Sequence, residues 1–198
     1  MQLSVELRWF WDERPAEVAD WFRRRDPEAG GGNDRRDCYF RQDDRTDLGI
    51  KIRGGQQGEG TEIEIKGLIA APPDLVGEMW GKWRSPSIPD GKSVVLVKRR
   101  WLRKLSLDGP AVEIALDANE KPVGAAERPE IGCNVELTRI EAEGQDGQWW
   151  SLGFEAFGSL ASAPGALVRA LDHLRPPALN GRLMNYPQFL ATLPRPPG

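Results

Sequence analysis

Hydrophobic and polar residues alternate along several segments of the chain, most clearly between Leu48 and Leu68. At the start of this segment Ile50 and Ile52 alternate with the charged residues Lys51 and Arg53. A period of two is typical of a β-strand that has one apolar and one polar face. A second alternating run follows after a glycine-rich stretch, so the segment predicts a β-hairpin.

The same alternation predicts further strands on both sides of this hairpin. In chain order, the eight predicted strands cover residues 2–11, 37–42, 48–53, 62–68, 93–105, 111–116, 133–140 and 148–157. Short connections between several of them favour antiparallel pairing. Because no strand shows an obvious means of protecting a free edge, the set is best satisfied by closing into a barrel.

Apolar residues recur at helical spacing in four other segments. These segments predict helices over residues 15–25, 73–84, 163–174 and 187–193. In the second of them the apolar face consists of Leu75, Val76, Met79, Trp80 and Trp83. We therefore expect an α+β fold, an antiparallel eight-stranded closed or nearly closed barrel with helices packed outside. We expect one domain over residues 1–193, followed by a flexible tail at 194–198.

The composition is typical of a soluble globular protein and excludes several classes of function. A net charge of −3 gives no electrostatic footprint for nucleic acid. No apolar run approaches 18 residues, and no signal peptide is evident, so we expect no membrane partner. Cys38 and Cys133 are the only cysteines and fit a reducing, cytoplasmic location better than a disulfide. With one histidine and two cysteines, a zinc or haem site is not expected.

Charged residues recur on the polar faces of the predicted strands. The basic members are Arg8, Lys51, Arg53, Lys66, Lys98 and Arg100, and the acidic members include Glu6, Glu64, Glu136 and Glu155. In a closed barrel covered by helices, these faces could all line the interior. Such a lining suits a polyanion held by lysine and arginine, with a divalent cation bridging its phosphates to carboxylates. The commoner meaning of a charged strand face is exposure to solvent, with charges paired across strands.

Several short motifs follow one another along these strands. They are Ser4-x-Glu6-x-Arg8, Asp37–Phe40, Ile50–Arg53, Ile63–Lys66, Lys98–Arg100, Val135–Leu137, Gly153–Glu155 and Asn185–Pro187. Their order resembles the CYTH superfamily, the triphosphate tunnel metalloenzymes. The resemblance covers nearly the whole chain and rests on the sequence of strands and helical inserts more than on any single motif.

This resemblance implies a barrel that binds a triphosphate or polyphosphate and hydrolyses it with a divalent metal. By this comparison, the phosphate ligands are Arg8, Lys51, Arg53, Lys66, Lys98 and Arg100. Glu6, Glu136 and Glu155 would hold one or two Mg²⁺ or Mn²⁺ ions, and Glu6 and Lys66 would act in catalysis. Their catalytic contribution would be positioning and charge stabilisation.

The chain departs from the family pattern at acidic positions. Ser4, Thr138 and Gly153 stand where the family carries carboxylates, and Arg8 stands where it carries a lysine. Fewer carboxylates weaken the binding of hard divalent cations, which need several oxygen ligands. A non-catalytic binding module for a phosphorylated ligand is therefore a second hypothesis. A structural barrel whose charges pair internally is a third.

Overall fold

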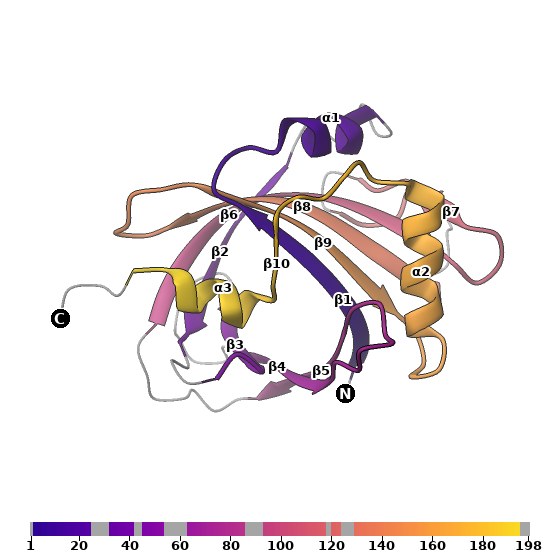
Figure 1. Cartoon of the computed structure of the whole chain (residues 1–198), viewed down its shortest axis with the longest axis horizontal. Coiled ribbons are helices and arrows are strands. Elements are labelled where there is room, and N and C mark those ends of the chain that lie inside the picture. The colour runs from indigo at the N-terminus through magenta and orange to yellow at the C-terminus, as the bar shows by residue number, and fades with distance from the viewer. Residues whose placement is uncertain are drawn as a thin grey trace.

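The described residues of the computed structural model form ten strands and three helices (Figure 1). The structure describes residues 2–24, 32–41, 45–53, 63–85, 93–117, 120–123 and 129–194. The elements are β1 (Gln2–Trp11), α1 (Ala16–Arg24), β2 (Asn33–Phe40), β3 (Leu48–Arg53), β4 (Ile63–Ala70), β5 (Glu78–Ser85), β6 (Ser93–Ser106), β7 (Val112–Ile114), β8 (Gly132–Ala142), β9 (Trp149–Phe157), α2 (Ala163–Leu174), β10 (Arg182–Leu183) and α3 (Tyr186–Thr192). The predicted glycine-rich turn and most of the predicted tail lie outside the described residues.

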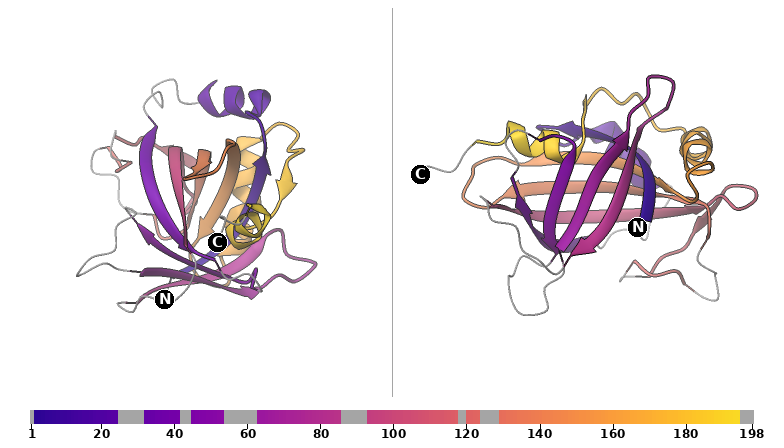
Figure 2. Two further views of the ribbon diagram at one scale, coloured as in Figure 1. Left: turned by 90° about the vertical axis from the view of Figure 1, so that its left-hand side faces the viewer. Right: turned by 90° about the horizontal axis from the view of Figure 1, so that it is seen from below.

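The sheet closes on itself because β1 pairs with two neighbours. Its residues Gln2 to Glu6 pair with β5, and Ser4 to Trp11 pair with β9. The order around the ring is β1, β5, β4, β3, β2, β6, β8 and β9, and every pairing is antiparallel. Figure 2 shows this ring from two further sides. The predicted α+β fold with an eight-stranded antiparallel barrel is confirmed.

One strand of the ring lies where the sequence pattern predicts a helix, so that prediction over residues 73–84 is wrong. Residues 78–85 form β5, which pairs with β1 on one edge and β4 on the other. The helical spacing was misleading because the two tryptophans of the segment also suit a strand, while Gly81 disfavours a helix. Trp80 is buried, but Trp83 is 41% exposed on the outside of the sheet.

The predicted strand over residues 111–116 is also placed differently from the expectation. Within it, Val112–Ile114 form β7, which pairs with the far end of β6 and lies off the closed ring. The very short β10 is likewise an addition, paired with β1 at Trp9 and Phe10. The ring thus has the expected number of strands but not the expected set, because β5 takes a place that was assigned to residues 111–116.

The largest apolar cluster lies on the outside of the barrel wall under α1 and α2. Alternate residues of β1, β8 and β9, among them Val5, Val135 and Phe154, pack against Leu167 and Ala170 of α2. This packing confirms the expectation of helices on the outside for these two elements. No helix in the described part of the chain is long and apolar enough to cross a membrane.

Helix α3 has a different position, at one end of the barrel interior. Phe189 and Leu190 of this helix belong to one cluster with Phe10, Leu96 and Ile140. These three strand residues share the inward-facing side of β1, β6 and β8 with the charged residues nearer the middle of the barrel. Phe189 stacks on Phe10 with ring centroids 4.4 Å apart. Thus α3 closes one end of the barrel, where the pattern predicted only outside packing.

The two cysteines lie on different strands and do not form a disulfide. Cys38 in β2 and Cys133 in β8 are both buried and free. Burial raises the pKa of the Cys133 thiol above its usual range, which keeps that thiol protonated and unreactive. The two thiols are unpaired, as expected, and the cytoplasmic location stays a prediction.

Candidate functional site

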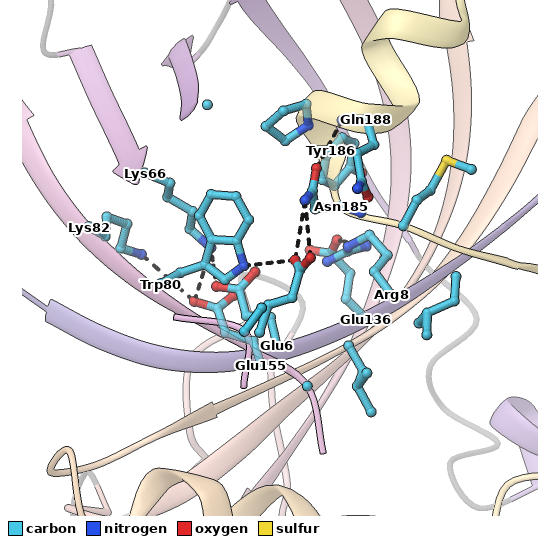
Figure 3. Close-up of a pocket in the computed structure, with 18 of the residues that line it drawn as sticks. Glu6, Arg8, Lys66, Trp80, Lys82, Glu136, Glu155, Asn185, Tyr186 and Gln188 are labelled. Carbon is cyan, nitrogen blue, oxygen red and sulfur yellow. Dashed lines mark hydrogen bonds and ion pairs between the residues drawn. The ribbon is translucent and has the colours of Figure 1, made fainter. Parts of the chain in front are cut away.

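The barrel interior holds a cavity of about 390 Å³ (Figure 3). Its lining includes eight basic side chains, Arg8, Arg35, Lys51, Arg53, Lys66, Lys82, Lys98 and Arg100, and five carboxylates, Glu6, Glu64, Glu78, Glu136 and Glu155. Every residue that the sequence predicts as a phosphate, metal or catalytic group lies in this lining. The charged strand faces therefore point into one shared cavity instead of outward to solvent.

Strand register brings these charges side by side. Glu6 lies directly opposite Glu155 on β9 and opposite Glu78 on β5. On the other side of the ring, Lys51 of β3 lies opposite Glu64 of β4. Such directly opposed residues have Cβ atoms about 4.5–5.5 Å apart, close enough for their side chains to interact. In the middle of the barrel the inward face is polar, because the apolar residues that alternate with these charges face outward.

Lys66 lies between two carboxylates on one wall. Its Nζ is 2.5 Å from Glu6 Oε1 and 3.6 Å from Glu155 Oε1. Lys82 Nζ lies 4.0 Å from the same oxygen of Glu155. Burial works against the charge of Lys66, but Glu155 and Glu6 outweigh it and raise the pKa of Lys66 above its ordinary value. We call Lys66, Lys82, Glu6 and Glu155 the Lys66 cluster.

Glu136 pairs with two arginines of the cavity. It accepts hydrogen bonds from Arg8 Nη1 and from Arg100 Nη1, each 3.1 Å long. Burial opposes the ionised carboxylate, but Arg8 and Arg100 hold the pKa of Glu136 well below its usual range. Arg100 also pairs with Glu120, which lies in the segment after β7. Both arginines are therefore charged and oriented before any ligand enters.

Lys98 lies on the side of the cavity closed by α3. Its Nζ donates a 2.6 Å hydrogen bond to the hydroxyl of Tyr39 and lies 4.0 Å from the centre of the Tyr186 ring. Among the described residues its ion-pair partner is Asp37, at 3.4 Å, and Asp37 is held more closely by Arg35, at 2.8 Å. Burial lowers the pKa of Lys98 to about 7, because Asp37 compensates only part of the lost hydration. We call Lys98, Asp37, Tyr39 and Tyr186 the Lys98 cluster.

A second lysine has a similar imbalance. Lys51 Nζ lies 2.9 Å from Glu64, but Arg53 takes the other oxygen of the same carboxylate at 2.8 Å. Burial lowers the pKa of Lys51 to about 8, although Glu64 acts in the opposite direction. Lys51 and Lys98 are thus two buried amines whose positive charge is incompletely compensated.

The three departures from acidic residues each support an ion pair of the cavity. Ser4 Oγ donates a 2.6 Å hydrogen bond to Glu6, and Thr138 Oγ1 donates a 3.1 Å hydrogen bond to Glu136. At Gly153 a Cβ atom would collide with the guanidinium of Arg8, so the missing side chain makes room for that group. Residues at these positions therefore stabilise carboxylate–cation pairs instead of adding carboxylates.

The carboxylates of the cavity are arranged for cations of the protein itself. Glu6 and Glu155 share Lys66, and Glu136 is held by two arginines. In the described ranges no three or more histidine, cysteine, aspartate or glutamate residues come together in a way that could hold a metal ion. As the side chains lie, the site does not fit a divalent cation, and the metal-binding role of Glu6, Glu136 and Glu155 stays a prediction.

Sequence reasoning missed several residues of the lining. Glu78, Trp80 and Lys82 face the cavity from β5, the segment that was predicted as a helix. Their own period of two, from residue 78 to 82, was a signal that could have revealed them. Arg35 was missed because β2 begins four residues before the predicted strand. Tyr186 reaches the cavity from α3, whose insertion no local pattern indicates.

Comparison with known proteins assigns the chain to no family. No protein-family model matches the chain, and no curated protein matches it. An adenylate cyclase candidate from Bacillus halodurans is 12% identical over 96% of this chain and 98% of that chain, with a TM-score of 0.44. A conserved hypothetical protein from Pyrococcus furiosus is 12% identical over 93% and 98%, with a TM-score of 0.48. A Pyrococcus horikoshii OT3 protein is 13% identical over 95% and 96%, with a TM-score of 0.41.

Proposed function

We propose that this protein binds a triphosphate or polyphosphate anion inside its barrel. The observation that carries the proposal is the charge of the cavity, where eight basic side chains face five carboxylates. Asp37 and Glu120 also pair with lining residues, and among the described residues the basic groups still outnumber the acidic ones. A buried charge without a partner is unfavourable, so an anion that supplies the missing negative charge is stabilised in this place.

Basic residues whose charge is incompletely compensated indicate where a bound anion is stabilised most. Lys98 and Lys51 lack full compensation, and Arg53 is half exposed at the edge of the cavity. Phosphate oxygens accept charge-assisted hydrogen bonds, which are about twice as strong as neutral ones. We assign the first contacts with phosphate to Lys98, Lys51 and Arg53, and further contacts to Arg8, Arg100 and Lys66, which keep their carboxylate partners.

Binding without turnover is the activity that this arrangement supports best. Hydrolysis with Mg²⁺ or Mn²⁺ would require Glu6, Glu136 and Glu155 to exchange lysine and arginine partners for a metal ion. Ser4, Thr138 and Gly153 favour the existing pairs, because two of them donate hydrogen bonds to carboxylates and the third makes room for Arg8. The proposal therefore gives the carboxylates the role of orienting cations toward the ligand.

The test is titration calorimetry of the whole chain with inorganic tripolyphosphate, without metal and with Mg²⁺ or Mn²⁺. We expect binding in the absence of metal and no release of orthophosphate in either condition. As a control, Arg139→Met should bind tripolyphosphate as tightly as the wild type does, because Arg139 is a part-exposed cation that pairs with Glu141 and does not line the cavity. Absence of binding in all conditions would show that the proposal is wrong. Metal-dependent release of phosphate would show that the protein hydrolyses its ligand instead of only binding it.

A further inference from the structure

Arg100 differs from the other basic side chains of the cavity in the origin of its carboxylate partners. One partner, Glu136, belongs to β8 of the closed ring and accepts a 3.1 Å hydrogen bond from Arg100 Nη1. The other partner, Glu120, lies off the ring, between β7 and β8. Within the described residues, every other ion pair of a lysine or arginine that lines the cavity is made with a carboxylate on a strand of the ring.

Glu120 occupies the edge of the Arg100 guanidinium that suits a phosphate group best. Its Oε1 accepts a 3.1 Å hydrogen bond from Nε of Arg100, and its Oε2 accepts a hydrogen bond from Nη2. Two parallel N–H donors on one edge bind a carboxylate or a phosphate with the same fork geometry. Glu136 already supplies a counter-charge to Arg100. Glu120 is therefore not needed to neutralise this arginine, and it fills a position that a ligand could use.

The backbone of Glu120 is held in a left-handed conformation, with a φ of 62°. Residues other than glycine seldom adopt it, because the Cβ atom comes too close to the following carbonyl oxygen. A tight turn maintains it. The N–H of Glu120 donates a 2.9 Å hydrogen bond to the carbonyl of Asp117, and the N–H of Asp117 donates a 2.8 Å hydrogen bond to the carbonyl of Lys121. The strain offsets part of the stabilisation from the ion pair, so another anion replaces Glu120 more easily.

We propose that Glu120 is a built-in competitor that occupies the phosphate-binding edge of Arg100 until a ligand takes its place. A phosphate group then accepts the hydrogen bonds of Nε and Nη2, while Glu136 keeps its bond to Nη1. The chain holds Glu120 beside Arg100 at a high effective concentration, so weakly charged anions do not displace it. The inference rests on the proposed anion binding and adds a means of regulating it.

The test is metal-free titration calorimetry with inorganic tripolyphosphate. Glu120→Gln keeps the size of the side chain and removes its charge, so we expect about fivefold tighter binding than in the wild type. Glu141→Gln is the matched control, because it makes the same change of charge at a residue that is 44% exposed and does not line the cavity. Its affinity should stay within about twofold of the wild type, since solvent and salt screen an exposed charge.

A second pair of variants tests whether the competition takes place at Arg100. Arg100→Lys keeps the positive charge but lacks the two parallel donors, so binding weakens and remains measurable. In this background the further change Glu120→Gln should raise the affinity by less than about twofold, because the contested edge is missing. An undiminished fivefold gain would show that Glu120 acts through long-range charge, and the inference would be wrong.

The outcomes separate this inference from the function on which it rests. If the wild type binds tripolyphosphate and Glu120→Gln binds it equally or less tightly, Glu120 orients Arg100 instead of competing with the ligand. The inference is then wrong and the proposed anion binding stands. If neither protein binds tripolyphosphate, both proposals fall together.

Discussion

Lys66 and Lys98 line the same cavity, the first largely and the second fully removed from solvent, but their surroundings act on them in opposite directions. Lys66 contacts Glu6 and Glu155, and its pKa lies above the ordinary lysine value. Lys98 contacts two phenol rings and one carboxylate that Arg35 shares, and its pKa falls to about 7. Burial alone therefore does not decide the charge of a lysine here, because the number of available carboxylates decides it.

This difference divides the cavity into two parts with separate tasks. The Lys66 cluster neutralises itself and should contribute to the stability of the barrel. In the Lys98 cluster the carboxylate of Asp37 is shared with Arg35, so the charge of Lys98 is incompletely compensated and the cluster should contribute to ligand binding. The comparison predicts that mutations in the two clusters have opposite balances of effect on unfolding and on binding.

The largest effect is expected from Lys66→Met. The change leaves Glu6 and Glu155 facing each other without their shared cation. Removing one partner of a buried ion pair costs about 3–5 kcal/mol, and the partial exposure of Lys66 reduces this to about 2–3 kcal/mol. Urea unfolding should show a loss of that size in the free energy of unfolding. Arg139→Met, which removes a surface cation, should change it by less than about 0.5 kcal/mol.

A double-mutant cycle with Glu6→Gln sharpens this prediction. If Lys66 and Glu6 act on stability through their direct contact, the double variant should lose less than the sum of the two single variants. Additive losses would mean that the 2.5 Å contact does not couple the two residues energetically. The Lys66 cluster would then not be the self-neutralised unit that the comparison requires.

The second-largest effect is expected from Lys98→Met, which should lower the affinity for tripolyphosphate. This change removes a buried amine whose charge is poorly compensated, so the free energy of unfolding should stay level or rise slightly. Tripolyphosphate should lose a charge-assisted hydrogen bond, on the order of 1.5–3 kcal/mol or about 10- to 150-fold in affinity. Calorimetry and urea unfolding of the same variant measure both quantities. Destabilisation equal to that of Lys66→Met would show that the two clusters do not differ as proposed.

The sequence predicted the inward-facing charges of the barrel better than it predicted their partners. A period of two assigns Lys51 and Arg53 to one face of a strand, and closure of the sheet then directs that face inward. The same pattern does not define which residues of two paired strands lie opposite each other, so it could not show that Lys66 lies between Glu6 and Glu155. Those contacts depend on pairing between residues as far apart as 6 and 155.

The local sequence pattern could not predict the type of one element of the site or the position of another, for different reasons. The residues of β5 have apolar positions that satisfy helical and strand periods at once, and pairing with β1 and β4 decides between them. The short helix α3 was predicted close to its true bounds, but its place in the barrel depends on the fit of Phe189 against Phe10. That fit brings Tyr186 to Lys98, a contact that only tertiary packing creates.

The smallest expected effect is uptake of a proton on ligand binding. In the unfolded chain Lys98 keeps its proton to about pH 10, whereas in the folded chain its pKa is about 7. The unfolded state therefore binds more protons between pH 7 and pH 10, and this lysine makes stability rise with pH across that window. A bound anion adds negative charge beside Lys98 and raises its pKa again. At pH 8 binding should take up a fraction of one proton, and affinity should fall as the pH rises above 7.

Calorimetry with tripolyphosphate at pH 8, in Tris and in HEPES, measures this uptake from the difference in observed heat between the two buffers. Lys51, with a pKa of about 8, should contribute as well, so Lys98→Met is expected to reduce the uptake without abolishing it. The last ionisation of tripolyphosphate itself enters equally in wild type and variant, and their difference isolates Lys98. Equal proton uptake in both proteins would mean that Lys98 is already charged in the free cavity. The two lysines would then differ in their partners and not in their protonation, and the division of the cavity would rest on the stability measurements alone.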